Sequence, residues 1–385
     1  MKSGALSRFR LTCFPGYILC AAAFGILVLS PSKGLSKPRT PRFKVIPAPY
    51  LHFPGGHNAN RQADFYADSN SPSHWDGDTF YVLNSWEQPW VASGSSLTQL
   101  GAGVPGSFND SELPKLWIWI ESSHKDADGT LYAWYHNEIP NLCPPRVDDI
   151  PGYPVSVKIG ALRSKDNGVH WENLGFIIEP DPESIDCRTE DMWYAGGTGD
   201  FSVHLDATKQ YFYFYFTNYS AVTTEQGICA ARLKFSDRNS PRGKIQFWIR
   251  GSWGQQSTIA CVTPIFPAEI DTRRRDGRTY WGPSIHWNSY LRTYVMVLNK
   301  IKDTTWATEG LYITFNKNIA NPNGWSRPEL LMTAEEARHA NPKKSANGWY
   351  VQVMGTRKGE TDKLASRAAR LFVDGQSRWE LDFQK

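Results

Sequence analysis

The sequence predicts an all-β protein, a five-bladed β-propeller of four-stranded antiparallel blades. Short segments rich in Tyr, Phe, Trp, Val and Ile alternate with Gly, Asn, Asp and Pro, and helical periodicity is nearly absent outside residues 333–340. Two strand-turn-strand patterns each recur four times along the chain. The 385 residues are 41% hydrophobic and 14% aromatic, so the chain can bury a large core.

The first repeated pattern is a strand ending in His-x-Asp or His-x-Asn, a turn, and an apolar strand ending in Asn. It occupies residues 71–84, 121–137, 201–218 and 283–299, and its histidines are His74, His124, His204 and His286. We expect each His to hydrogen-bond a neighbouring blade or to line the central channel. The acids that follow, Asp76, Asp126 and Asp206, are ordinary turn residues.

The second repeated pattern is a strand, a tight Asp- or Asn-containing turn, and a Trp that opens the next strand. It occupies residues 161–171, 231–248, 311–325 and 369–379. One copy of each pattern gives four antiparallel strands, which is one propeller blade. Residues 347–356 and 369–383 form the fifth blade, and residues 43–47 add a strand that fastens the first blade to the last.

The N-terminus has the form of an export signal. Lys2, Arg8 and Arg10 precede the apolar residues 17–30. We therefore divide the chain into a signal peptide or N-terminal anchor (1–30), a linker (31–42) and a single propeller domain (43–385). This division predicts a secreted or periplasmic protein, or one anchored to the membrane by an uncleaved N-terminal segment, with no other membrane-spanning segment.

Export permits disulfide bonds. Cys143 and Cys187 both lie in Pro- and Asp-rich loop sequence, so we expect them to pair, whereas Cys229 lies in an apolar strand and is expected to be buried. The net charge of +4 is small, and the one dense basic cluster, in residues 271–279, is flanked by acids. We interpret this cluster as a solvated loop, and the charge pattern gives no support to nucleic-acid binding.

One carboxylate departs from the repeat. Asp200 begins the innermost strand of its blade, where the other blades have Asn70, Ile120 and Gly282. The preceding "AGGTG" (195–199) is expected to let the backbone approach a ligand closely. Asp68 lies two residues before Asn70 and points to the same side if that strand extends so far.

A hairpin returns the chain, so the ends of the second strands reach the same face as the starts of the first strands. The polar residues expected there, besides Asp68 and Asp200, are Asn70, Asn84, Asn137, Glu138, Glu190, Asp191, Asn218 and Asn299, and the tryptophans are Trp86, Trp193, Trp281 and Trp349. Such a pocket suits a sugar, because sugar faces stack on aromatic rings and paired carboxyl groups perform acid/base hydrolysis.

These features resemble the five-bladed propeller glycoside hydrolases of the arabinanase, β-xylosidase and invertase type. The resemblance is carried by "DSNSPSHWDGDTFYVLNS" (68–85), "GTGDFSV" (197–203) and "YITFNKNIANPNGWSRP" (312–328). It implies an Asp base or nucleophile on the first blade, an Asp that tunes the acid, and a Glu acid on a later blade.

Carried over by position, Asp68 matches the first role and Asp200 is the tuner or the acid itself. Direct alignment of the first hairpin places Asn70 at the first-blade position. Glu138, Glu190 and Glu309 are candidates for the acid, and Glu138 is preferred.

A second, local resemblance is that of "SKDNGVHW" (164–171) to the Asp-box of sialidases. This motif makes a tight turn and packs its Trp inside a blade, so it indicates a propeller and says little about substrate. A sialidase also needs an arginine triad; Arg61, Arg163, Arg357 and Arg367 are available, but no matching N-terminal arginine motif is present. We rank a sialidase below a hydrolase of neutral sugars.

The sequence thus predicts an exported glycoside hydrolase of poly- or oligosaccharides, with Asp68, Asp200 and Glu138 as catalytic residues. The expected substrate-binding residues are Asn70, Asn84, Trp86, Glu190, Asp191, Asn218, Trp281, Asn299 and Trp349. No cofactor or catalytic metal is expected, and a structural ion in the central channel is compatible with the pattern. The alternative from another class is a propeller that binds carbohydrate without cleaving it.

Overall fold

The computed structural model describes residues 41–54, 67–86, 88–108, 117–145, 150–255, 259, 262–342 and 346–385. The predicted signal segment (1–30), most of the linker and the side chain of Trp86 lie outside the described residues. In the described part of the chain, no helix is both long enough and apolar enough to cross a membrane.

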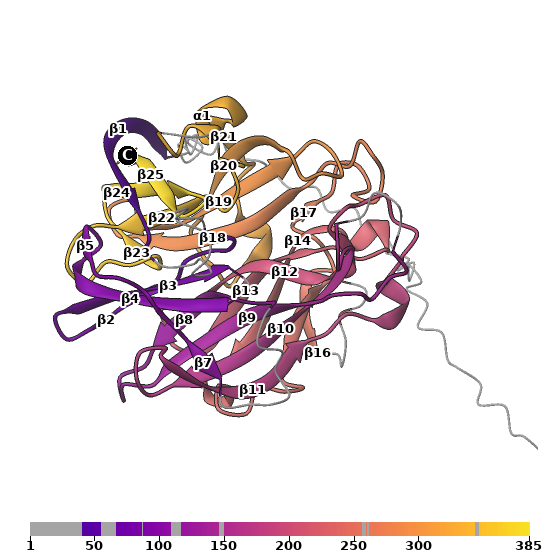
Figure 1. Ribbon diagram of the computed structural model, residues 1–385, viewed down its shortest axis with the longest axis horizontal. Coiled ribbons are helices and arrows are strands. Elements are labelled where there is room, and N and C mark those ends of the chain that lie inside the picture. Colours follow the sequence, from indigo (N-terminus) through magenta and orange to yellow (C-terminus); the bar gives the residue numbers. More distant parts are fainter. Residues whose placement is uncertain are drawn as a thin grey trace, which may run out of the picture. The chain divides into compact units, whose positions relative to one another are not determined.

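The described chain is all-β (Figure 1), and its strands pair into four sheets. We divide these sheets into five antiparallel runs, of which the second and third belong to one sheet because a strand of each pairs in parallel. The first run contains β2 (Ser73–Asp76), β3 (Thr79–Trp86), β4 (Gln88–Ser96) and β5 (Gln99–Leu100), and β6 (Val104–Pro105) also pairs with β4. The second contains β8 (Ile118–Lys125), β9 (Leu131–Ile139), β10 (Val155–Ser164) and β11 (His170–Ile178), with β7 (Ser107–Phe108) parallel to β11.

The third run contains β12 (Tyr194–Leu205), β13 (Tyr211–Asn218), β14 (Gly227–Lys234), β15 (Gln246–Ile249) and β16 (Ser252–Gln255), and β17 (Phe266–Pro267) also pairs with β14. The fourth contains β18 (Tyr280–Asn288), β19 (Thr293–Ile301), β20 (Thr308–Asn316) and β21 (Glu329–Thr333), with β23 (Leu364–Ala365) parallel to β18. The fifth contains β22 (Gln352–Gly355), β24 (Ala368–Val373), β25 (Gln376–Gln384) and β1 (Arg42–His52).

The pairings confirm both repeated patterns. The His-containing hairpins are β2–β3, β8–β9, β12–β13 and β18–β19, and the Trp-opened pairs are β10–β11, β14–β15, β20–β21 and β24–β25. The predicted fastening strand is also confirmed, because β1 pairs along β25, so the start of the described chain lies beside its end (Figure 1).

Hydrophobic clusters join each run to the next. Aromatic side chains of the third run, such as Phe214 and Phe216, pack on Trp134 and Ile159 of the second. Other clusters join the first run to the second, the third to the fourth, the fourth to the fifth and the fifth to the first. This closed order is what the predicted propeller requires, and the number of blades stays a prediction.

The only α-helix of the described residues, α1 (Ala334–Arg338), falls within the predicted residues 333–340. Thr333 and Glu336 form a reciprocal capping box that begins it. Short 3₁₀ turns occupy Pro182–Ser184, Thr223–Glu225, Phe235–Asp237 and Pro322–Gly324.

The turn that resembles an Asp-box connects β10 to β11. Ser164 Oγ donates to Asp166 Oδ1 at 2.8 Å and accepts from the backbone N–H of Gly168 at 2.9 Å. Asp166 Oδ1 also accepts from the N–H of His170 at 2.9 Å, and Trp171 is buried. The acidic side chain therefore fixes the turn, and the indole packs in the core.

The repeated histidines are buried or nearly so. His74 Nε2 lies 3.1 Å from Asn167 Oδ1 on the next run, and His204 Nε2 lies 3.2 Å from the carbonyl of Lys363. Burial lowers the pKa of His74 and of His124 to about 4, and that of His286 to about 3.

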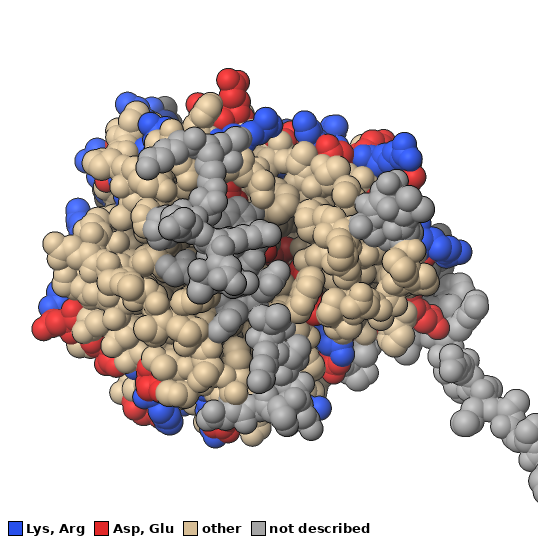
Figure 2. All heavy atoms as spheres, in the orientation of Figure 1, with Lys and Arg blue, Asp and Glu red and all other residues tan. Residues whose placement is uncertain are grey.

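In Figure 2, charged side chains of both signs lie mostly around the rim of the face, and the described residues nearer its centre are largely uncharged. In residues 271–279, Arg273 pairs with Asp271, Arg274 with Asp276, and Arg275 with Glu190. Arg274, Arg275 and Asp276 are exposed, which agrees with the interpretation of this segment as a solvated loop, whereas Thr272 and Thr279 are buried.

Cys143 and Cys187 form the expected disulfide, and Cys229 is a buried free thiol. Cys261 lies outside the described residues.

Candidate active site

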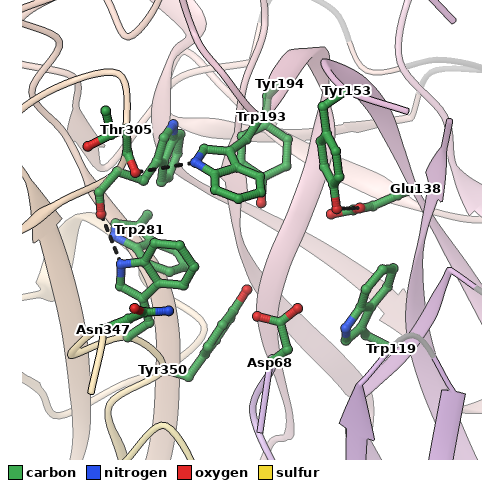
Figure 3. Close-up of a pocket in the computed structure, with 12 residues that line it drawn as sticks. Asp68, Trp119, Glu138, Tyr153, Trp193, Tyr194, Trp281, Thr305, Asn347 and Tyr350 are labelled. Carbon is green, nitrogen blue, oxygen red and sulfur yellow. Dashed lines mark hydrogen bonds between the residues drawn. The ribbon is translucent and has the colours of Figure 1, made fainter. Parts of the chain in front are cut away.

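A cavity of about 530 Å³ opens among the ends of strands from several runs. Two carboxylates and five tryptophans contribute to its wall, and Figure 3 shows how they lie around it. Its lining residues are Asp68, Trp119, Glu138, Tyr153, Trp193, Tyr194, Trp281, Thr305, Trp306, Asn347, Trp349 and Tyr350. We call this cavity the aromatic pocket.

Asp68, Glu138 and Trp119 all line the aromatic pocket, and in Figure 3 Asp68 lies to the left of the Trp119 indole and Glu138 lies above it, next to Tyr153. The backbone N–H of Asp68 donates to the carbonyl of Ser85 at 3.1 Å, which ties Asp68 to the end of β3. Its side chain is half-buried. Thus Asp68 reaches the predicted mouth although it precedes β2 by several residues.

Glu138 lies near the end of β9, where the register pairs it with Val157 of β10. The glutamate is 5% exposed, and Tyr153 Oη donates to its Oε2 at 2.8 Å. His136 Nε2 lies 3.9 Å from Glu138 Oε1. Glu138 is therefore held in a defined position at the cavity wall.

Asp200 lies behind the cavity wall and is only 1% exposed. Tyr219 Oη donates a hydrogen bond to Asp200 Oδ2, and Tyr194 Oη lies 3.4 Å from the same oxygen. The backbone of Asp200 is left-handed, with φ of 43°, at a bulge between β12 and β13. A left-handed non-glycine residue costs about 1–2 kcal/mol, so the surrounding contacts hold Asp200 in a strained position.

The glycines before Asp200 serve a different purpose from the one expected. Gly197 has φ of 101°, and a Cβ there would overlap the backbone of Val157. A Cβ at Gly196 would approach the carbonyl of Ser184 to 2.7 Å. The expectation that this segment admits a ligand is corrected, because these glycines allow β12 to pack closely against β10 and the adjoining loop.

Glu121 was missed by the sequence analysis. It is buried on β8, and its Oε2 accepts from the N–H of Phe201 at 2.9 Å. Its other oxygen is hydrogen-bonded to His136 Nδ1. The available signal was a single acid in "WIWIESSH" (117–124), next to Ile120, the position that matches Asp200 in the repeat.

Burial shifts the pKa values of this group. It raises the pKa of Glu121 and lowers that of His136. Burial, then the charge of Glu121, raises the pKa of Asp200 to about 6. One ligand atom from each of Glu121, His136 and Asp200 lies within 4.8 Å of the others, so these three are the described residues able to hold a cation together.

Asp191 organises the tryptophan wall without lining the pocket. Its buried Oδ1 accepts from the N–H groups of Trp193 at 2.8 Å and Tyr194 at 3.1 Å. Trp306 Nε1 donates to Asp191 Oδ2 at 3.0 Å. Asp191 was predicted to bind substrate. Its carboxylate instead accepts hydrogen bonds from residues that form the wall, which it thereby positions.

Further hydrogen bonds fix the rest of the wall. Trp193 Nε1 donates to the carbonyl of Thr305 at 3.3 Å, and Trp349 Nε1 donates to that of Trp306 at 2.9 Å, both drawn in Figure 3. Asp374 accepts from the N–H groups of Gly348 at 2.9 Å and Trp349 at 3.1 Å. Burial raises the pKa of Asp374 to about 7.

The structure places the other predicted residues as follows. Trp281 and Trp349 line the aromatic pocket, as expected. Glu190 is exposed and accepts from the N–H of Arg275, and Glu309 pairs with Lys300 and Arg278. Of the three candidate acids, Glu138 is the one that lines the cavity.

The four predicted asparagines are buried and do not line the cavity. Asn70 donates to the carbonyls of Phe201 and Pro283, and Asn218 to that of Glu225. Asn299 joins the N–H of Val351 to the carbonyl of Gly348, and Asn84 is 1% exposed. The first three amides join backbone segments, so the prediction that these asparagines form the substrate surface gains no support.

Comparisons with known proteins gave matches among solved structures alone. No family model matches the chain, and no curated protein matches it. The structure is similar to an endo-arabinase from Bacteroides thetaiotaomicron (14% identity, 83% of this chain and 93% of that chain, TM-score 0.44). It is also similar to an α-L-arabinanase from Cellvibrio cellulosa complexed with arabinohexaose (11%, 83% and 91%, TM-score 0.47) and to a thermostable family-43 glycoside hydrolase (9%, 82% and 88%, TM-score 0.46). These low scores carry no argument about the activity or substrate of this chain.

Proposed function

We propose that the protein is an exported glycoside hydrolase that cleaves a poly- or oligosaccharide in the aromatic pocket. The observation that carries the proposal is the presence of Asp68 and Glu138 in one cavity walled by tryptophans. Aromatic walls bind sugar faces, and glycoside hydrolysis needs two carboxyl groups that flank the scissile bond. The predicted export signal and the Cys143–Cys187 disulfide support the exported location.

Glu138 is assigned as the general acid and Asp68 as the base or nucleophile. The acid must carry a proton when substrate binds, and burial favours the neutral form of a carboxyl group. Glu138 is the more buried of the two, and the hydrogen bond from Tyr153 fixes its orientation. Asp68 is more open to water, which favours the ionised form that a base or nucleophile needs.

Asp200 is assigned a positioning role, in place of direct catalysis. It is separated from the cavity by Tyr194, which lines the wall and lies within hydrogen-bond distance of its carboxylate. It also holds Tyr219, whose ring stacks on that of Tyr194 at 3.9 Å. Loss of the Asp200 carboxylate should therefore disturb the cavity wall and leave Asp68 and Glu138 in place.

The test uses purified wild type, Asp68→Asn and Glu138→Gln on a panel of plant, fungal and bacterial glycans. Both variants should bind the cleaved glycan and lose at least about 100-fold in rate, the usual contribution of one acid or base. Glu190→Gln is the matched control, because Glu190 is exposed and outside the cavity. Equal cleavage by wild type and Glu138→Gln would refute the assignment.

The alternative is a propeller that binds carbohydrate without cleaving it, and the tryptophan wall alone would support it. The two functions differ in one outcome of the same panel. If wild type binds a glycan through Trp193 and cleaves none, the binding function is the right one. A sialidase stays below both, since no arginine of the described residues lines the aromatic pocket.

A further inference from the structure

A second cavity, of about 400 Å³, adjoins the aromatic pocket. Thr305, Asn347 and Trp349 line both cavities, so they form a shared wall. The second cavity is completed on its other side by Lys302, Thr308 and Arg338. We call it the basic pocket, because its two charged lining residues are both cations.

The cations of the basic pocket differ from others nearby in lacking a partner. Within the described residues, neither Lys302 nor Arg338 forms an ion pair with a carboxylate, and both are exposed. In contrast, Lys300 pairs with Glu269 and Glu309, and Arg278 pairs with Glu309. The positive charge at the basic pocket is thus available to an anion from outside the chain.

The shared wall is held in place by hydrogen bonds. Thr308 Oγ1 donates to the carbonyl of Asn347 at 3.2 Å or to that of Gly348 at 3.1 Å. Asp374 accepts from the N–H groups of Gly348 and Trp349 on the same segment. A saccharide that stacks in the aromatic pocket therefore meets the basic pocket across a fixed edge.

We propose that the basic pocket is a subsite for an anionic substituent, a carboxylate or a sulfate ester, on a sugar unit next to the one held in the aromatic pocket. The inference rests on the saccharide site of the proposed function and adds a substrate class, an acidic glycan. Arg338 offers a planar donor fork suited to either oxyanion, and Lys302 adds a second charge. The neighbouring tryptophans bind the uncharged ring faces.

The experiment measures dissociation constants by calorimetry in the full chain carrying Glu138→Gln, so that no probe is cleaved. The probes are an oligogalacturonate and its methyl ester, and a sulfated galactan oligosaccharide and its desulfated form. Each pair shares a backbone and differs in charge. At low salt, at least one charged probe should bind about 10-fold more tightly than its neutral partner, and 0.5 M NaCl should remove most of that preference.

Lys302→Met and Arg338→Met are each added to this background. Each should weaken the binding of the charged probe by about 3- to 5-fold and leave the affinity for the neutral probe unchanged. Lys244→Met is the control, because Lys244 is an exposed lysine that lines neither cavity. A preference for only one charged probe would identify the anion.

Equal affinities within both pairs, a preference that survives both substitutions, or no binding of any probe would overturn the anionic subsite. The proposed hydrolase is judged separately by cleavage in the wild type. A charge preference that depends on Lys302 and Arg338, in a protein that cleaves no glycan, would support the subsite and refute the hydrolase.

Discussion

The buried histidines make the folded state sensitive to acid, and His286 gives the sharpest prediction. Its side chain is 1% exposed on β18, and its Nε2 has no hydrogen-bond partner among the described residues. Burial is the largest cause of its low pKa, followed by the charges of His204 and Lys363. The folded protein therefore keeps His286 neutral, whereas the unfolded chain protonates it near pH 6.5.

The size of the acid destabilisation follows from the difference between the pKa of His286 in the unfolded and in the folded state. The pKa of His286 falls from 6.5 to about 3 on folding. Burial of the neutral imidazole therefore leaves the free energy of unfolding at its full value above pH 6.5 and lowers it as the pH falls from 6.5 toward 3. Between pH 7.5 and pH 5, protonation of the unfolded chain at this one site costs about 2 kcal/mol of the free energy of unfolding. That loss is large against the 5–15 kcal/mol typical of folded domains.

The assay compares wild type with His286→Gln by urea unfolding, followed by tryptophan fluorescence, at pH 7.5 and pH 5. On acidification, the free energy of unfolding of the wild type should fall by about 2 kcal/mol more than that of the variant, because Gln does not titrate. Buried Asp200 and Asp374, whose raised pKa values act in the opposite direction, cancel in this difference. His286→Leu serves as the control, since it changes the packing differently but must give the same difference between the two pH values. A difference that stays constant with pH would refute the argument that His286 is kept neutral by burial.

Two further predictions concern stability. Reducing the disulfide or replacing both cysteines in Cys143→Ser/Cys187→Ser should lower the free energy of unfolding by about 4 kcal/mol, because the bond closes a loop of sequence separation 44; an unchanged urea midpoint would contradict this. Gly197→Ala should cost about 3 kcal/mol or more, because its Cβ would overlap Val157 and its φ is 101°. Gly77→Ala, also at positive φ but with no atom within 4 Å of the added Cβ, is the control and should cost distinctly less in the same urea titration.

Strand pairing could be predicted because it is a local property of the sequence. Each His-containing hairpin and each Trp-opened pair is a contiguous segment whose turn residues mark its centre. The pairing of β1 with β25 was also foreseen, because a closed ring needs a strand to join its ends. The disulfide followed from two cysteines in loop sequence of an exported chain.

The site was predicted less completely, because it is built from contacts distant in sequence. Glu138 was placed by strand-end geometry, and it lines the cavity. Asp68 lines the cavity too, but β2 begins only at Ser73, so the strand alternation from which Asp68 was predicted does not reach it. Glu121 escaped notice because its function depends on Phe201 and His136, which the repeat does not connect to it. The asparagines could not be assigned for a related reason. A side-chain amide at a strand end can hydrogen-bond either a ligand or a neighbouring backbone, and the sequence does not distinguish the two.

The rate loss of a Glu138 variant on two substrates with different leaving groups decides whether Glu138 is the general acid. Glu138→Gln should be compared with wild type on a natural glycan that the wild type cleaves and on the matching nitrophenyl glycoside, whose leaving group needs no proton. If Glu138 is the general acid, the rate falls by about 10²–10⁴-fold on the glycan and much less on the nitrophenyl glycoside. Equal losses on the two substrates, or full activity on both, would contradict the claim that Glu138 protonates the leaving group.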